Sequence, residues 1–178
     1  MSKYEQPDYR VVHTGDGYEI RHYESYLVAE TTVSGNFDSV GTTAFRRLAG
    51  FIFGRNSDGV KMNMTVPVTR EPGGPGEYHY RFVMEKAYSE AELPRPVDED
   101  VRISRVPAGF HAAMRYRGSR KEAQYRRAEM ALMNALERDG IATRGTPVSA
   151  VYDGPFTPSI LRRNEVLVPV GWEAPQAG

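Results

Sequence analysis

The sequence contains no cysteine, so neither a disulfide nor thiolate-bound zinc can stabilise this chain. It also has no excess of charge, because 23 lysine and arginine residues balance 23 aspartate and glutamate residues. A neutral chain without a basic segment argues against nucleic acid and membrane surfaces as partners. No stretch approaches the roughly 20 apolar residues of a membrane span, and the N-terminus lacks the apolar run of a signal peptide. We therefore expect a cytoplasmic protein and take it to be a monomer.

The length of 178 residues fits one domain with a substantial core. Residues 1–17 are polar and rich in turn-forming residues, so we predict a flexible segment there. A single domain is predicted over residues 18–172, followed by a frayed tail at 173–178.

The domain contains two halves, at about 18–92 and 101–172, that share one order of elements. The first half predicts strands at 18–23, 26–33, 60–69 and 78–85, with a helix over 40–53 between the second and third of them. The second half predicts strands at 101–106, 110–117, 146–152 and 164–170, with a helix between Ser119 and Gly140. Asn36 or Asp38 is expected to cap the first helix, and Ser119 with Glu122 to form a capping box for the second.

Short sequence matches support a duplication. Val28–Gly35 aligns with His111–Gly118, and Thr65–Val68 aligns with Gly145–Val148 at nearly the same offset. Each half is then a strand-helix-strand-strand unit with one apolar helix face and one apolar sheet face. Joining the two units buries these faces, which predicts an α+β fold: a distorted, mainly antiparallel β-barrel flanked by two helices.

The first predicted helix is apolar on more than one face. Its core face carries Ala44, Leu48 and Ile52, while Phe45, Ala49 and Phe53 recur every four residues on a neighbouring face. A helix that contacts the core along one stripe has no structural need for the second. The second face therefore points to a ligand or partner.

Four sequence blocks resemble the signature blocks of the SOUL haem-binding proteins. They are Tyr18–Glu24, Ala44–Asn56, Lys61–Val68 and Arg162–Val166, in the order of that family. The resemblance implies a duplicated αβ fold with a distorted barrel and two flanking helices. It also implies reversible, non-covalent binding of haem or other porphyrins in an apolar cleft beside the first helix.

Five residues are candidates for the wall of that cleft: Phe45, Ala49, Phe53, Met62 and Met64. A flat apolar porphyrin favours aromatic surface, and methionine side chains adapt to it. The alternative is that all five belong to the core.

His22 is the candidate axial ligand of the haem iron, because it is the histidine inside a family block and imidazole coordinates iron. The alternative is a half-buried histidine that is hydrogen-bonded to backbone or carboxylate. His79 and His111 are weaker candidates, and His13 is the weakest.

Arg162 and Arg163 are candidate partners of the haem propionates, because a guanidinium offers paired donors to a carboxylate. They follow the aliphatic loop 156–161, which is placed to close over a flat ligand. The alternative is a solvated arginine pair. Arg46 and Arg55 are less specific candidates for the same role.

Glu165 supports a different function. The segment 164–170 is similar to the end strand of bacterial effector-binding, gyrase-inhibitor-like domains, which use a buried glutamate to hold cationic amphiphiles. A buried carboxylate needs a partner, and Arg162 or Arg163 is the simplest one.

The sequence shows no nucleophile-base pair, no phosphate-binding loop and no set of metal ligands. We therefore expect a binding protein for haem or a related tetrapyrrole, acting in transport, buffering or sensing, and not an enzyme. Two alternatives stay open: the effector-binding module, and an enzyme that acts on a tetrapyrrole or a small electrophile in the same cavity.

Overall fold

The computed structural model describes residues 4–154 and 157–174. Its elements follow the chain in this order: β1 Tyr9–Thr14, β2 Glu19–Tyr23, β3 Tyr26–Ser34, α1 Gly41–Ile52, β4 Val68–Pro72, β5 Glu77–Val83, β6 Val101–Val106, β7 Gly109–Arg117, α2 Glu122–Arg138, β8 Val148–Val151, the short 3-10 helix η1 Ser159–Leu161, and β9 Arg163–Pro169. The predicted tail at 173–178 lies outside the described residues from position 175 onward.

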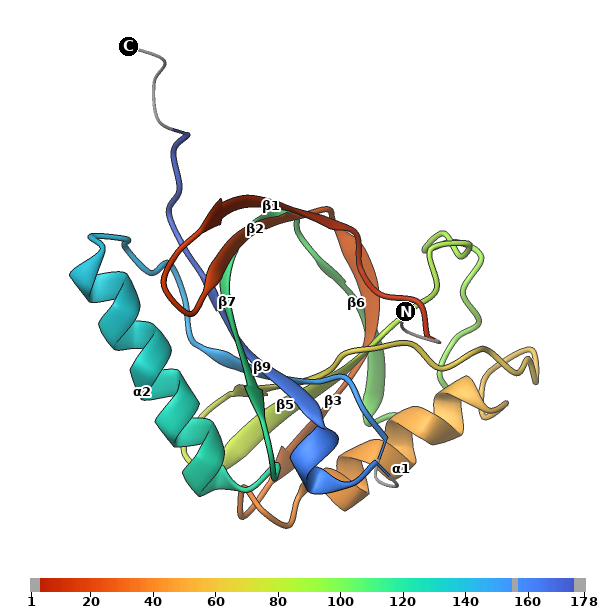
Figure 1. Ribbon diagram of the computed structural model, residues 1–178. Helices are drawn as coiled ribbons and strands as arrows, with labels where there is room; N and C mark the ends of the chain where they lie inside the picture. The colour runs from red at the N-terminus through yellow and green to blue at the C-terminus, as the bar shows by residue number, and fades with distance from the viewer. Residues whose placement is uncertain (1–3, 155–156, 175–178) are drawn as a thin grey trace.

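One curled antiparallel sheet carries all nine of these strands, in the order β1-β2-β7-β9-β8-β4-β5-β3-β6. The two helices pack on the outside of the curl, and the opposite face of the sheet is concave (Figure 1). This arrangement confirms the predicted α+β class, with an antiparallel half-barrel flanked by two helices.

The strand pairing repeats between the two halves. β3 and β4 both pair with β5 in the first half, as β7 and β8 both pair with β9 in the second. The halves meet where β4 pairs with β8, and they also exchange their outer strands. β2 pairs with β7 of the second half, whereas β6 pairs with β3 of the first half. The halves are therefore joined at three places in one sheet.

Three apolar clusters hold the layers together. α1 buries Ala44, Leu48 and Ile52 against the outward-facing residues of β3, β5 and β6. α2 buries Leu132 and Leu136 against the outward-facing residues of β2, β7 and β9. A third cluster lies on the concave face and contains Val66, Ala113, Ala150, Tyr152 and Leu167. Side chains therefore alternate along each strand between a helix and the concave face.

The N-terminal segment differs from the prediction of a flexible 1–17. Strand β1 lies inside it and pairs with β2, from Tyr9 opposite Tyr23 to Thr14 opposite Glu19. β1 is an edge strand with an exposed Val11, so its sequence lacks the strict apolar alternation that identifies a half-buried strand.

The predicted strand at 60–69 is also shorter in the structure, because β4 begins only at Val68. The backbone before it pairs elsewhere: Met62 N–H donates to the carbonyl of Ile52, and Val66 N–H donates to the carbonyl of Glu5. Pro67 has no N–H to offer to a ladder. The segment 60–67 therefore connects α1 and the N-terminus to the sheet.

Neither predicted side-chain cap forms, and α2 is capped by a contact between the halves. The side chains of the N-cap residues Val40 and Lys121 form no cap hydrogen bond in α1 and α2. Instead, the Asp38 carboxylate accepts the N–H of Glu122 at 2.9 Å, so a loop of the first half caps the helix of the second. A carboxylate at this position also interacts favourably with the positive, N-terminal end of the helix dipole.

Candidate ligand-binding site

The second apolar face of α1 is exposed in the structure. Phe45 and Phe53 are 47% and 53% exposed, although α1 packs its other face into the core. The Phe45 ring contacts the buried Phe82 edge-on, with ring centroids 5.4 Å apart, so its position is fixed by β5. At about 1.5 Å per residue, the backbone positions of Phe45 and of the C-cap residue Phe53 lie about 12 Å apart along the helix axis. We name Phe45, Ala49 and Phe53 the α1 stripe.

The other residues predicted for the cleft wall are less accessible. Ala49, between the two phenylalanines in sequence, is buried against the core of the first half. Met62 is buried in the same core, and Met64 is half-buried against it. The structure therefore divides the predicted set. Phe45 and Phe53 present surface to solvent, whereas Met62 and Met64 support α1 from below.

Basic side chains accompany the α1 stripe. Arg46 and Arg55 are exposed, and the Arg55 side chain lies along the helix close to Gly50. Lys61 forms an isolated bridge with Phe53 and is also exposed. Three exposed cations therefore lie on or next to the segment that carries the apolar stripe, and they favour an anionic ligand.

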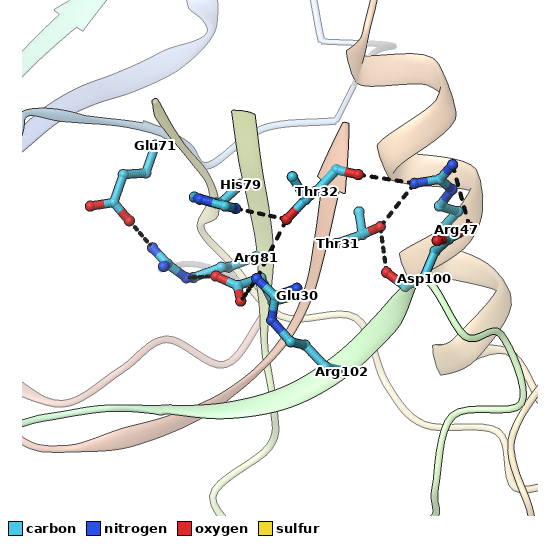
Figure 2. A network of polar contacts seen from close by, with 9 residues as sticks. All are labelled: Glu30, Thr31, Thr32, Arg47, Glu71, His79, Arg81, Asp100 and Arg102. Carbon is cyan, nitrogen blue, oxygen red and sulfur yellow. Dashed lines mark hydrogen bonds and ion pairs between the residues drawn. The ribbon is translucent and has the colours of Figure 1, made fainter. Parts of the chain in front are cut away.

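A small hollow of about 270 Å³ lies beside α1, but its lining is mainly polar. Thr32, Ser34, Thr43, Arg47 and Asp100 line it, together with two valines. Arg47 donates to the Thr31 hydroxyl and to the carbonyl of Thr32, and it lies 3.6 Å from Asp100 (Figure 2). The hydrogen bonds of Arg47 join α1 to β3. The hollow is lined by other residues than the α1 stripe.

His22 lies on the other half of the sheet. It projects from β2 on the side of α2, with its ring edge-on to Phe110 at 4.9 Å. Its Nδ1 is buried without a hydrogen bond, and Glu24 lies 3.9 Å away. Phe110 and Trp172 line a hollow of about 460 Å³ beside it. Since α1 packs on β3, β5 and β6, the structure does not bring His22 to the α1 stripe.

Arg162 and Arg163 directly follow η1, at the start of β9. Arg162 donates to the carbonyl of Thr157, next to η1. Arg163 begins β9, and its guanidinium stacks 4.1 Å above the Tyr152 ring, 3.5 Å from Glu165. Part of the loop 156–161 that precedes them lies outside the described residues, since Phe156 is not described.

Glu165 is buried on the concave face, and its partner is Arg21 on β2. Arg21 donates to both carboxylate oxygens, at 2.9 and 2.7 Å, and the two side chains are 2% and 0% exposed. Arg21 also donates to Glu19 at 3.0 Å and to the Tyr23 hydroxyl at 2.8 Å. Burial raises the pKa of Glu165, but the hydrogen bonds and charge of Arg21 outweigh burial, so the pKa lies below its ordinary value.

A second ionic network lies on the concave face of β3, β4, β5 and β6. Glu30 is buried; it accepts a hydrogen bond from Arg81 at 2.7 Å and forms an ion pair with Arg102 at 2.5 Å, while Arg81 also pairs with Glu71. Figure 2 shows these groups beside His79, whose Nδ1 lies 2.8 Å from the Thr32 hydroxyl. Two arginines balance two glutamates here, so this network is neutral.

The sequence matches the SOUL heme-binding protein family over residues 4–169, which covers both halves of the sheet. The chain belongs to the SOUL haem-binding protein family. Human Heme-binding protein 2 is 38% identical over 93 residues, a match that spans 48% of this chain and 45% of the human protein. Mouse Heme-binding protein 2 is 29% identical over 157 residues, spanning 84% of this SOUL chain and 76% of the mouse protein.

Solved structures with the same fold are distant in sequence. The EcmrR C-terminal domain superposes with a TM-score of 0.68 at 13% identity, covering 92% of this SOUL chain and 98% of that domain. A hydrolase from Listeria innocua superposes with a TM-score of 0.63 at 13% identity, covering 86% of this SOUL chain and 91% of the hydrolase chain. SAV2435 bound to tetraphenylphosphonium superposes with a TM-score of 0.55 at 12% identity, covering 86% of this SOUL chain and 93% of that chain. At these identities the likeness shows the fold alone.

Two further observations describe the SOUL chain. Within residues 4–154 and 157–174, no three histidine or acidic side chains are grouped so that they could hold a metal ion. Across the same residues, neither helix has the length and apolar character needed to cross a membrane.

Sequence analysis missed two residues that contribute to these sites. The first is Arg21, whose partner Glu165 is 144 residues away in the sequence. The second is Lys61, which lies beside Phe53 because residues 60–67 fold back along the end of α1. Both contacts depend on backbone pairing between segments that the sequence pattern does not predict.

Proposed function

We propose that this chain binds haem or a related porphyrin non-covalently on the α1 stripe, for transport, buffering or sensing. The observation that carries the proposal is the pair of half-exposed phenylalanine rings on α1 in a member of a haem-binding family. Exposed aromatic surface of this kind is costly in water and marks a binding surface. A flat porphyrin that lies along α1 covers both rings.

The propionates of such a porphyrin are proposed to pair with Arg46, Arg55 and Lys61, which lie on or next to the segment that carries the stripe. Guanidinium forks and an ammonium group suit carboxylates that stay at the solvent edge. Arg162 and Arg163, the partners predicted from sequence, instead contact Thr157, Tyr152 and Glu165. The proposal therefore places the propionate contacts on the elements that carry the stripe.

The proposal describes a binding protein and assigns no catalytic residue. The α1 stripe offers apolar contact to the porphyrin ring, and the neighbouring cations offer charged contacts to its carboxylates. The effector-binding alternative needs a carboxylate that is free to meet a cation, whereas Arg21 already occupies both oxygens of Glu165.

Hemin is expected to bind with about one saturable equivalent per chain, because only α1 has a second apolar face. The corresponding helix α2 buries Ala128, Leu132 and Leu136 along a single stripe. The measurement is a titration of the purified chain with hemin, followed by Soret absorbance. Two saturable equivalents would contradict the assignment of one stripe, and a linear, non-saturable response would contradict haem binding itself.

Replacing His22 by alanine is expected to leave hemin affinity unchanged, because His22 and the α1 stripe lie on different halves of the sheet. A porphyrin on α1 is beyond reach of this imidazole. The measurement is the same titration, with the Soret band recorded between pH 8 and 5. Loss of a sharp, pH-sensitive band together with lower affinity would show iron ligation by His22. That outcome would move the porphyrin to the hollow between Phe110 and Trp172.

A further inference from the structure

The concave face beside Glu165 holds more guanidinium groups than carboxylates can balance. Arg21 takes both oxygens of Glu165 at hydrogen-bond distance. Arg163 and Arg115 lie 3.5 and 3.8 Å from Oε2 of Glu165, an oxygen that already accepts a hydrogen bond from Arg21. Their side chains are 26% and 52% exposed, so both face solvent on this side of the sheet. One buried carboxylate is therefore surrounded by three cations.

The strand register adds a fourth cation. Arg117 lies directly opposite Arg163 in the β7–β9 ladder, and Arg115 lies opposite Glu165. Like charges in directly opposite positions destabilise a sheet, so this pair is not explained by stability. Arg117 makes one long contact, 3.4 Å, to the carbonyl of Leu161.

The acids nearby have other partners. Glu19 accepts from Arg21, and the Asp153 carboxylate accepts the backbone N–H of Arg163. Counting Arg21, Arg115, Arg117 and Arg163 against Glu19, Glu165 and Asp153 leaves one positive charge in excess, four against three.

Two further arginines, Arg120 and Arg162, belong to the segments that flank this end of the ladder. Arg120 donates to the backbone carbonyl of Asp153. Burial and the charge of Arg162 lower the pKa of Arg120, while the Asp153 carboxylate raises it. This end of β7 and β9 therefore has more guanidinium groups than carboxylates, although the whole chain is neutral.

A buried apolar and aromatic cluster lies next to these cations. The Arg163 guanidinium stacks on Tyr152, and Tyr152 packs with Leu167 and Val66 on the concave face. The Nε of Arg163 is buried and donates no hydrogen bond to the described residues. Stacking fixes the plane of the guanidinium, which prepares its remaining donors for a carboxylate.

We propose that the concave face at the β7–β9 ladder binds an organic anion, a carboxylate carried on an aromatic or aliphatic body. Arg115 and Arg163 provide the charged donors, and the planar Arg163 guanidinium, held against the buried Tyr152 ring, offers its open face to the body of the ligand. This site is separate from the α1 stripe, and the proposal does not rest on haem binding. The proposed site prefers an anion, whereas the effector-binding alternative prefers a cation. A cation would need a free Glu165 carboxylate, and Arg21 already neutralises it.

The test uses two flat probes of similar shape and opposite charge, 2-naphthoate and 2-naphthylmethylammonium, titrated into the intact chain by calorimetry. Naphthoate is expected to bind at least about tenfold more tightly than the ammonium probe, because charged hydrogen bonds form with only one of them. This comparison needs no variant. Equal affinities, tighter binding of the ammonium probe, or no saturable heat with naphthoate would each overturn the proposal.

Variants locate the site. The double substitution Arg115→Gln with Arg163→Gln is expected to weaken naphthoate binding at least about tenfold. Arg105→Gln is the matched control, since Arg105 is a strand arginine that is 49% exposed on β6. Phe45→Asp is expected to keep naphthoate affinity, which separates this site from the proposed haem site. Unchanged naphthoate affinity in the double variant would overturn the assignment.

Discussion

Replacing Arg21 by methionine is expected to lower the free energy of unfolding by about 3–5 kcal/mol, because it leaves a buried carboxylate without its partner. Arg21 and Glu165 are both buried, and two hydrogen bonds of 2.9 and 2.7 Å join them across β2 and β9. Glu165 then keeps the hydrogen bond with Tyr152 and the more distant charges of Arg163 and Arg115. The measurement is urea unfolding followed by far-ultraviolet circular dichroism.

Two controls define the cause of that loss. Arg21→Met combined with Glu165→Leu is expected to restore most of the stability, since replacing both members of a buried pair by apolar groups is close to neutral. Arg102→Met removes a half-exposed partner of Glu30, which Arg81 still holds, and is expected to cost about 0–1 kcal/mol. A loss below about 1 kcal/mol for Arg21→Met alone would contradict a structural role for the pair.

The same pair predicts a pH dependence. Arg21 holds the pKa of Glu165 below its ordinary value of 4.5, despite burial, so the folded state binds this proton less readily than the unfolded state. The stabilisation is therefore complete above pH 4.5 and is lost as the pH falls through the lower folded pKa. In Arg21→Met the contributions of Arg21 that oppose burial are lost, so the pKa of Glu165 is expected to rise relative to the parent, and protonation relieves the buried charge. The difference in stability between parent and variant is thus expected to shrink from pH 7 to pH 4.

The duplicated order of elements was enough to predict the fold class. Each half repeats its glycine stops and its strand-helix-strand-strand pattern, and the structure repeats the pairing of β3, β4 and β5 in β7, β8 and β9. The exchange of β2 and β6 between the halves was not predictable from the pattern, because alternation fixes which face a residue occupies but not which strand lies beside it.

Contacts between distant segments limited the prediction of the sites. Asp38 was expected to cap the helix that follows it, yet it accepts the N–H of Glu122 in the other half. Glu165 was expected to pair with a neighbour in sequence, yet Arg21 is nearer, since β7 lies between β2 and β9 and their concave-facing side chains meet across it. Local sequence signals identify the groups that need a partner, and the sheet order supplies the partner.

The burial of the predicted cleft residues shows a further limit. Phe45, Ala49 and Met62 have the same apolar character in sequence, but only Phe45 of these three presents a large side chain to solvent. The helical period separates two faces of α1, and on the second face Phe45 and Phe53 are exposed whereas Ala49 is buried in the core. The methionines follow α1 in a segment whose backbone bonds to Ile52 and Glu5, so no regular period describes which of them faces the core.

The double substitution Phe45→Asp with Phe53→Ser is expected to weaken hemin binding by about 2–3 kcal/mol, or roughly 30- to 150-fold. Both rings are about half exposed, so the surface that a porphyrin would cover is surface that the fold itself leaves in water. For the same reason the variant is expected to fold, with Phe45 losing its edge contact with Phe82. The measurement is hemin titration by Soret absorbance, alongside urea unfolding of each chain.

Met130→Asp is the matched control, because Met130 is a large apolar side chain on α2 that is 65% exposed, and the substitution adds the same charge as Phe45→Asp. It is expected to leave hemin affinity unchanged, since α2 has no second apolar face beside Met130. Equal losses in Met130→Asp and in the stripe variant would mean that hemin responds to charge alone. Undiminished affinity in a folded stripe variant would remove α1 as the haem site and leave the hollow beside His22 as the place to search.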